Sequence, residues 1–183
     1  MSAEPDTTSA FDVRRPMGWS IGGALGGAVG AAAFGLFMWL VDPEILDAAI
    51  PALYGLKPTG VAGWTIHIAH GIVLGLVFGF LVTRKPVLGV LQADADTDAL
   101  SGAGQWLRVT ATGFVFGLAI WAILPVLVLP VWMEAIAAGS AAEFPTVAID
   151  SLLGHLLFGT VLGLVFATVV DLDGRTVESV SED

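Results

Sequence analysis

Four long apolar stretches, separated by more polar segments, dominate the pattern of this chain. They cover about 17–41, 61–83, 107–132 and 147–170. A helix needs about 20 apolar residues to cross a bilayer, because the hydrocarbon core is roughly 30 Å thick and each residue rises about 1.5 Å. The pattern therefore predicts an all-α membrane protein with four transmembrane helices.

The more polar segments divide these helices into two pairs. We expect residues 17–83 to form one two-helix membrane repeat and residues 106–170 to form a second. Acidic residues concentrate at 1–16, 84–105 and 171–183. We interpret these segments as a disordered tail, a linker and a second tail, all of them cytoplasmic.

The two loops at the other end of the predicted helices are apolar as well. Residues 43–56 and 130–139 carry only one or two acids each and are too short to span a bilayer. They predict short interfacial helices after the first and third membrane helices. A re-entrant loop is the alternative.

Composition narrows the class of protein. Of the 183 residues, 56% are hydrophobic and only 13% are charged, and the mean hydropathy is +0.85. Soluble domains are about 25% charged, so a cytosolic enzyme is excluded and the lipid bilayer is the expected partner. The net charge of −10 excludes a basic surface for nucleic acid, and the lack of cysteine excludes disulfides and thiolate ligands.

The basic residues predict the orientation. All of the seven lysines and arginines except Lys57 fall on one side of the predicted helices. The positive-inside rule makes that side cytoplasmic, so we expect a multi-pass protein of the cell membrane with both termini inside. Abundant acid with scarce lysine is typical of a hypersaline cytoplasm and favours a halophilic archaeon, the alternative being an acidic interaction tail.

A repeated motif indicates an internal duplication. The sequence VLGLVF occurs at 73–78 and again at 161–166, and this match aligns His67 with His155. A second match aligns the FGL sequence that starts at Phe34 with one in the third helix. Chance reuse of Gly and Leu is the alternative. We expect the repeats to be related by a pseudo-twofold axis along the membrane normal, with helix 61–83 beside helix 147–170.

Small residues recur every four positions along three of the predicted helices. Such stripes let helices approach closely, because packing drives association in lipid. The expected packing residues are Gly22, Gly26, Gly30, Gly71, Gly75, Gly159 and Gly163.

Three histidines, His67, His70 and His155, are the candidate intramembrane polar or cofactor-binding site. Ionisable residues inside a membrane are costly and indicate function. The predicted axis would place His67 and His155 at equal depth near it, with His70 beside them. Three interpretations stay open: hydrogen bonds that fix helix packing, ligation of a haem or metal ion, and a proton relay or solute path.

Catalytic motifs are absent from the sequence. It contains no C-x-x-C-H, H-E-x-x-H, Walker, G-x-S-x-G or dinucleotide-binding pattern. We therefore predict no catalytic residue and no cofactor, with a haem or metal ion as the alternative; a metal-binding set is not defined.

The segment 50–78, echoed at 152–166, resembles a group of small four-helix haloarchaeal membrane proteins of unknown function. The resemblance covers the membrane region and implies the fold and the lipid location, but no activity. Some members of that group carry the label "histidine kinase". The chain contains no ATP-lid glycine motif or asparagine box, so we do not expect kinase activity.

These observations predict a non-enzymatic integral membrane protein, with small-solute or proton transport as the specific hypothesis. A haem- or metal-binding electron-transfer subunit that uses His67 and His155 is the alternative. A four-helix chain with so few polar residues would need partners to form a wide path. We therefore expect a homo-oligomer or other membrane subunits.

Overall fold

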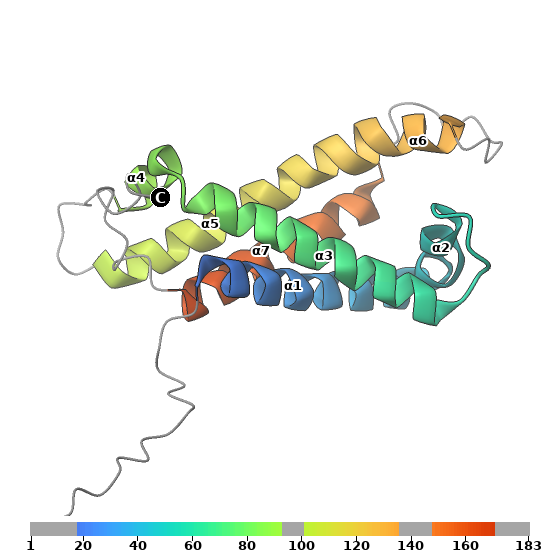
Figure 1. The fold of residues 1–183 in the computed structure, drawn as a ribbon, viewed down its shortest axis with the longest axis horizontal. Helices are drawn as coiled ribbons and strands as arrows, with labels where there is room; N and C mark the ends of the chain where they lie inside the picture. The colour runs from blue at the N-terminus through green and yellow to red at the C-terminus, as the bar shows by residue number, and fades with distance from the viewer. Residues whose placement is uncertain (1–17, 93–100, 136–147, 171–183) are drawn as a thin grey trace, which may run out of the picture.

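A computed structural model describes residues 18–92, 101–135 and 148–170 of the chain (Figure 1). The described parts are helical, and they contain four helices that are long and apolar enough to cross a membrane. The predicted all-α membrane fold is confirmed. The acidic tails predicted at 1–16 and 171–183 lie outside the described residues.

The four spans follow the apolar stretches of the sequence closely. They are α1 (Trp19–Val41), α3 (Gly60–Val82), a composite third span (Gly104–Ala135) and α7 (Ile149–Val169). Most of their outward side chains are apolar, as are most of their inward ones. Helices that are apolar all round are suited to a lipid environment, in which the outer face needs no polar residues.

Prolines and short polar side chains end the first two spans. Asp42 precedes Pro43 and is extended, with φ −153° and ψ 96°, as the residue before a proline prefers. Its Oδ1 accepts the backbone N–H of Glu44 at 3.0 Å. At the other end of the bundle the Thr83 hydroxyl lies 3.0 Å from the Phe80 carbonyl oxygen and donates to it, which satisfies a carbonyl at the end of α3.

The loop after α1 contains two short helical segments, η1 (Ile45–Ala49) and α2 (Ile50–Ala52). It folds back onto α3, where Leu46 is completely buried and its backbone carbonyl lies against Gly63. Gly55 closes the loop with φ +67°, a backbone conformation that glycine adopts without steric cost. A short helix therefore lies in the predicted segment 43–56.

The third span differs from the prediction at its C-terminal end. It consists of α5 (Ser101–Ile123), a π-helical turn η2 (Leu124–Val128) and α6 (Leu129–Ala135). Pro125 has no N–H for the helical ladder, and a π turn accommodates that loss without breaking the helix. Residues 129–135 thus continue the span, whereas we expected a separate interfacial helix from 130; residues 136–139 of that segment lie outside the described residues.

A further helix, α4 (Lys85–Gln92), lies in the segment that we interpreted as a linker. Its Leu88 and Leu91 are buried, with exposures of 0% and 3%. This part of 84–105 is therefore packed against the bundle.

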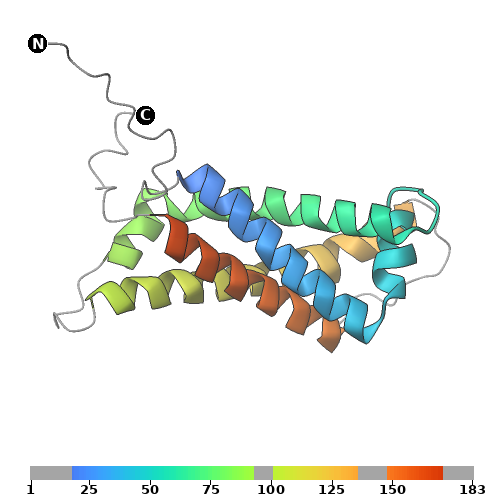
Figure 2. The same ribbon diagram turned by 90° about the horizontal axis from the view of Figure 1, so that it is seen from below.

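The helices are arranged as two hairpins joined through α1 and α7. The first hairpin pairs α1 with α3, the second pairs α5 with α7, and α1 runs along α7 between them (Figures 1 and 2). We expected α3 to run along α7; instead it reaches α7 through the ring pair Phe78–Phe166, whose centroids are 5.4 Å apart.

This arrangement also departs from the predicted twofold axis. An axis that exchanged the hairpins would lay α3 along α5 just as α1 lies along α7. Instead the described parts of α3 and α5 do not run along one another, and their ring pair Phe78 and Phe116 has centroids 5.4 Å apart. The sequence duplication itself stays a prediction.

Both hairpins are closed by glycines that bring two backbones together. A Cβ on Gly27 would lie 3.0 Å from the Cα of Gly75, closer than side chains normally approach backbone. In the second hairpin a Cβ on Gly113 would lie 2.8 Å from the Cα of Gly163. Gly71 and Gly159 meet the backbones of α1 and α5 in the same way.

Gly22, Gly26 and Gly30 form a different contact. They face α7, where a Cβ on Gly30 would lie 2.8 Å from the carbonyl oxygen of Phe158. The first helix therefore carries two glycine stripes, one for each neighbouring helix. The stripe that contacts α3 contains Gly23 and Gly27, which the sequence reading did not single out.

Candidate functional site

His67 is buried at the interface between α1 and α3, with 9% of its surface exposed. Its Nε2–H donates to the carbonyl oxygen of Ala31 at 3.0 Å. This is a hydrogen bond between helices, because Ala31 belongs to α1. The ring of Phe34 packs edge-on against the imidazole with centroids 5.2 Å apart.

His155 occupies a comparable depth on α7. At about 1.5 Å per residue, His67 lies roughly 10 Å along α3 from Gly60, and His155 roughly 9 Å along α7 from Ile149. The Nδ1–H of His155 donates to the Ser151 carbonyl oxygen of its own helix at 2.7 Å.

Phe34 connects the two histidines. Its ring also packs edge-on against His155, with centroids 4.8 Å apart, and it lies over Gly154, where any side chain would collide with it. The structure thus brings His67 and His155 to one aromatic side chain.

Each of these imidazoles bonds to a backbone carbonyl oxygen. In the part of the chain that the structure describes, no group of three or more His, Cys, Asp or Glu side chains could hold a metal ion. An ion or haem held by both histidines would have to compete with the Phe34 ring. The arrangement can fix the packing of α1 against α3 and α7.

His70 does not join this pair. It is exposed on the surface of α3, although it lies only one turn from the buried His67. Its Nε2 is hydrogen-bonded to the hydroxyl of Tyr54, and the two rings are 5.8 Å apart between centroids. Since Tyr54 follows α2, this bond connects the loop to the membrane helix.

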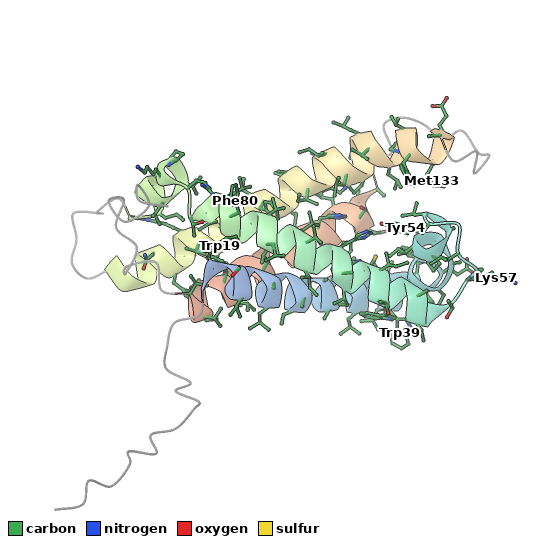
Figure 3. The ribbon with its side chains drawn as sticks, in the orientation of Figure 1. Trp19, Trp39, Tyr54, Lys57, Phe80 and Met133 are labelled. Carbon is green, nitrogen blue, oxygen red and sulfur yellow. The ribbon has the colours of Figure 1, made fainter. Side chains whose placement is uncertain are left out.

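The residue before Tyr54 makes a second connection. The Nε1–H of Trp132, on α6, donates to the carbonyl oxygen of Leu53 at 3.1 Å. Leu53 and Tyr54 therefore join the first hairpin to the C-terminal part of the third span. Figure 3 places Tyr54 at the same end of the bundle as Lys57 and Met133, opposite Trp19 and Phe80.

One polar atom in the described residues is buried without a hydrogen-bond partner, the Nε1 of Trp121 on α5. Buried donors in native structures usually have a partner, and an unpaired one requires an explanation such as a bound water. Its position along the third span places Trp121 in the same half of the bundle as His70.

Sequence reasoning found the histidines and missed their partners. Phe34 was part of a matched motif but had no chemical role in it. Tyr54 is the single tyrosine of the chain, which was the available signal for a polar group in an apolar loop.

No protein-family model, curated protein or solved structure matches this chain. Its class therefore rests on the described fold, which is that of a multi-pass α-helical membrane protein.

Proposed function

We propose that the protein moves protons or a small polar solute across the membrane, with Tyr54 and His70 as its polar site. It acts as a non-enzymatic component of the cell membrane. The observation that carries this proposal is the hydrogen bond between Tyr54 and His70.

That bond lies at membrane depth. His70 is roughly 15 Å along α3 from Gly60, close to the middle of the span. An imidazole there is expensive unless it is paired, and paired ionisable groups inside membranes mark proton and ion paths. Imidazole and phenol can both donate and accept, so the pair can pass a proton through its hydrogen bond.

The packing of the hairpins supports a path beside them rather than through them. The backbones of α1 and α3 touch at Gly27 and Gly75, as do those of α5 and α7 at Gly113 and Gly163, which leaves no width for water there. The unpaired Nε1 of Trp121 offers a further donor to a water or solute in the outer half.

A second copy of the chain or another subunit would complete this path. The outer part of the third span exposes Leu127, Val131 and Trp132 by 49%, 61% and 48%. A partner helix on this face would enclose the exposed His70 side and keep lipid away from it. The distribution of basic residues places both termini in the cytoplasm. The resemblance to small haloarchaeal membrane proteins favours a halophilic source.

The test is proton flux into liposomes that contain the purified protein and a trapped pH-sensitive dye. We expect faster dissipation of an imposed pH gradient than in empty liposomes. His70→Phe and Tyr54→Phe should each return the rate most of the way to that of empty liposomes. Thr168→Val, which removes a hydroxyl at the C-terminal end of α7, far along the bundle from His70, should leave the rate unchanged.

Swelling of the same liposomes in glycerol or urea tests the solute variant of the proposal. Protein that accelerates neither proton flux nor swelling would overturn the function. Transport that persists at full rate in both His70→Phe and Tyr54→Phe would overturn the site.

A further inference from the structure

We propose that Arg84 and Lys85, at the end of the bundle opposite Tyr54, bind the phosphate of an anionic phospholipid. This site is separate from the Tyr54–His70 pair and does not depend on its function.

Arg84 is held at the lipid-facing surface by an aromatic side chain. Its guanidinium carbon lies 3.6 Å above the centroid of the Phe80 ring, and Phe80 is 44% exposed on the outside of α3. Trp19 of α1 packs edge-on against the same ring with centroids 6.2 Å apart. Figure 3 shows Trp19 and Phe80 together at this end of the bundle.

These contacts orient the guanidinium for binding. Stacking on a ring uses its flat face and leaves the N–H groups along its edge directed outward. A tryptophan beside it is typical of the level of lipid headgroups, where one end of the side chain is apolar and the other polar. Arg84 is therefore presented where a phosphate would lie.

Lys85 is placed beside Arg84 by the start of α4. The Arg84 carbonyl oxygen accepts the backbone N–H of Leu88 at 2.8 Å, so α4 begins immediately after Arg84. Buried Leu88 and Leu91 fix this helix against the bundle, whereas Val90 is 70% exposed. The Arg84 guanidinium over the exposed Phe80 ring matches a lipid, which has a headgroup above an acyl chain, better than free phosphate.

Arg108 of α5 secures the same helix. Its Nη1–H donates to the carbonyl oxygen of Leu91 at 3.2 Å. The described residues at this end thus include three cations, Arg84, Lys85 and Arg108, while the described acids Asp42, Glu44, Asp47, Glu134 and Asp150 belong to the opposite end. These three cations attract an anionic headgroup, and each cation near a membrane surface contributes about 1 kcal/mol to such binding.

The experiment is native mass spectrometry of the protein in mild detergent with equal amounts of phosphatidylglycerol and phosphatidylcholine. We expect the wild type to retain phosphatidylglycerol preferentially. Arg84→Gln and Lys85→Gln should each lower that preference about fivefold. Lys57→Gln, which removes one positive charge from the opposite end, should leave it unchanged.

Several outcomes would overturn the proposal. An unchanged preference in the double variant Arg84→Gln/Lys85→Gln would show that other residues bind the lipid, and an equal loss in Lys57→Gln would show an effect of net charge. Displacement of the lipid by millimolar inorganic phosphate would identify a site for free phosphate instead.

If Arg84→Gln fails to fold, Lys85→Gln and Arg84→Lys replace it. Both should bind phosphatidylglycerol less selectively than the wild type, and wild-type selectivity in both would reject the site. His70→Phe should retain the wild-type preference, which separates this test from that of the proposed function.

Discussion

The ring of Phe34 lies directly over Gly154, so that a Cβ at Gly154 would fall 2.6 Å from the Cζ of the ring. Phe34 belongs to α1 and Gly154 to α7, and the same ring contacts His67 of α3 and His155 of α7. One side chain of the first helix thus connects three of the four spans. The missing side chain at Gly154 is what makes room for it.

Gly154→Ala should therefore destabilise the bundle. The added methyl group would push the Phe34 ring off both imidazoles, at a cost of about 1–3 kcal/mol, as is usual for overpacking. The free energy of unfolding can be measured by titrating detergent-solubilised protein with SDS and following helical circular dichroism.

Phe34→Leu supplies the control for this prediction. In the double variant Phe34→Leu/Gly154→Ala the smaller side chain should accept the methyl group, so the second substitution should cost less than it does alone. If the two costs simply add, Phe34 and Gly154 do not act on each other in the way the structure indicates.

Gly75→Ala should be at least as damaging, for a different reason. Its Cβ would lie 2.8 Å from the Cα of Gly27, and backbone cannot rotate away as a side chain can. The two helices of the first hairpin would have to separate, which we expect to cost about 2–3 kcal/mol in the same SDS titration.

Gly89 provides a matched substitution. It also lies in a helix, α4, but nothing is within 4 Å of a Cβ built there. Gly89→Ala should leave stability unchanged or raise it by up to about 1 kcal/mol, because alanine is the better helix former. Equal losses in Gly75→Ala and Gly89→Ala would contradict the interlocked backbones.

The four spans could be predicted because hydrophobic length is a local property of the chain. Which helices meet could not, since all four are apolar on every side and α1 carries glycine stripes on two adjacent faces. Gly26 and Gly27 are neighbours in sequence, yet the first faces α7 and the second faces α3. The faces do not differ in hydrophobicity, so only the three-dimensional packing shows which helix each face contacts.

The contacts of the histidines could not be predicted from the sequence either. The repeated motif pairs His67 with His155, but it does not show what His67 and His70, one turn apart on an apolar helix, each contact. They differ because Ala31 of α1 meets His67, whereas Tyr54 of a distant loop meets His70. Contacts between residues far apart in the chain set the role of each histidine.

Trp132→Phe should loosen the loop that carries Tyr54. The substitution keeps an aromatic ring on α6 but removes the N–H that donates to the Leu53 carbonyl oxygen. Hydrogen–deuterium exchange should become several-fold faster in residues 50–59 and stay unchanged in the middle of α1. Trp39→Phe, a half-exposed tryptophan at the same end, is the control; if it accelerates exchange in that loop as much, the Leu53 bond is not responsible.

The orientation of the bundle can be tested with two introduced cysteines, because the chain has none of its own. Gly89 lies on α4 at the end with Arg84 and Lys85, and Lys57 lies in the loop at the opposite end. Both positions are exposed, so a thiol at either one would be accessible to a reagent. The positive-inside rule places the Arg84 end in the cytoplasm. A membrane-impermeant maleimide added to intact cells should then label Lys57→Cys and not Gly89→Cys, and lysis should make Gly89→Cys reactive. The reverse pattern would invert the topology, and would also move the proposed phospholipid site to the outer leaflet without altering its residues.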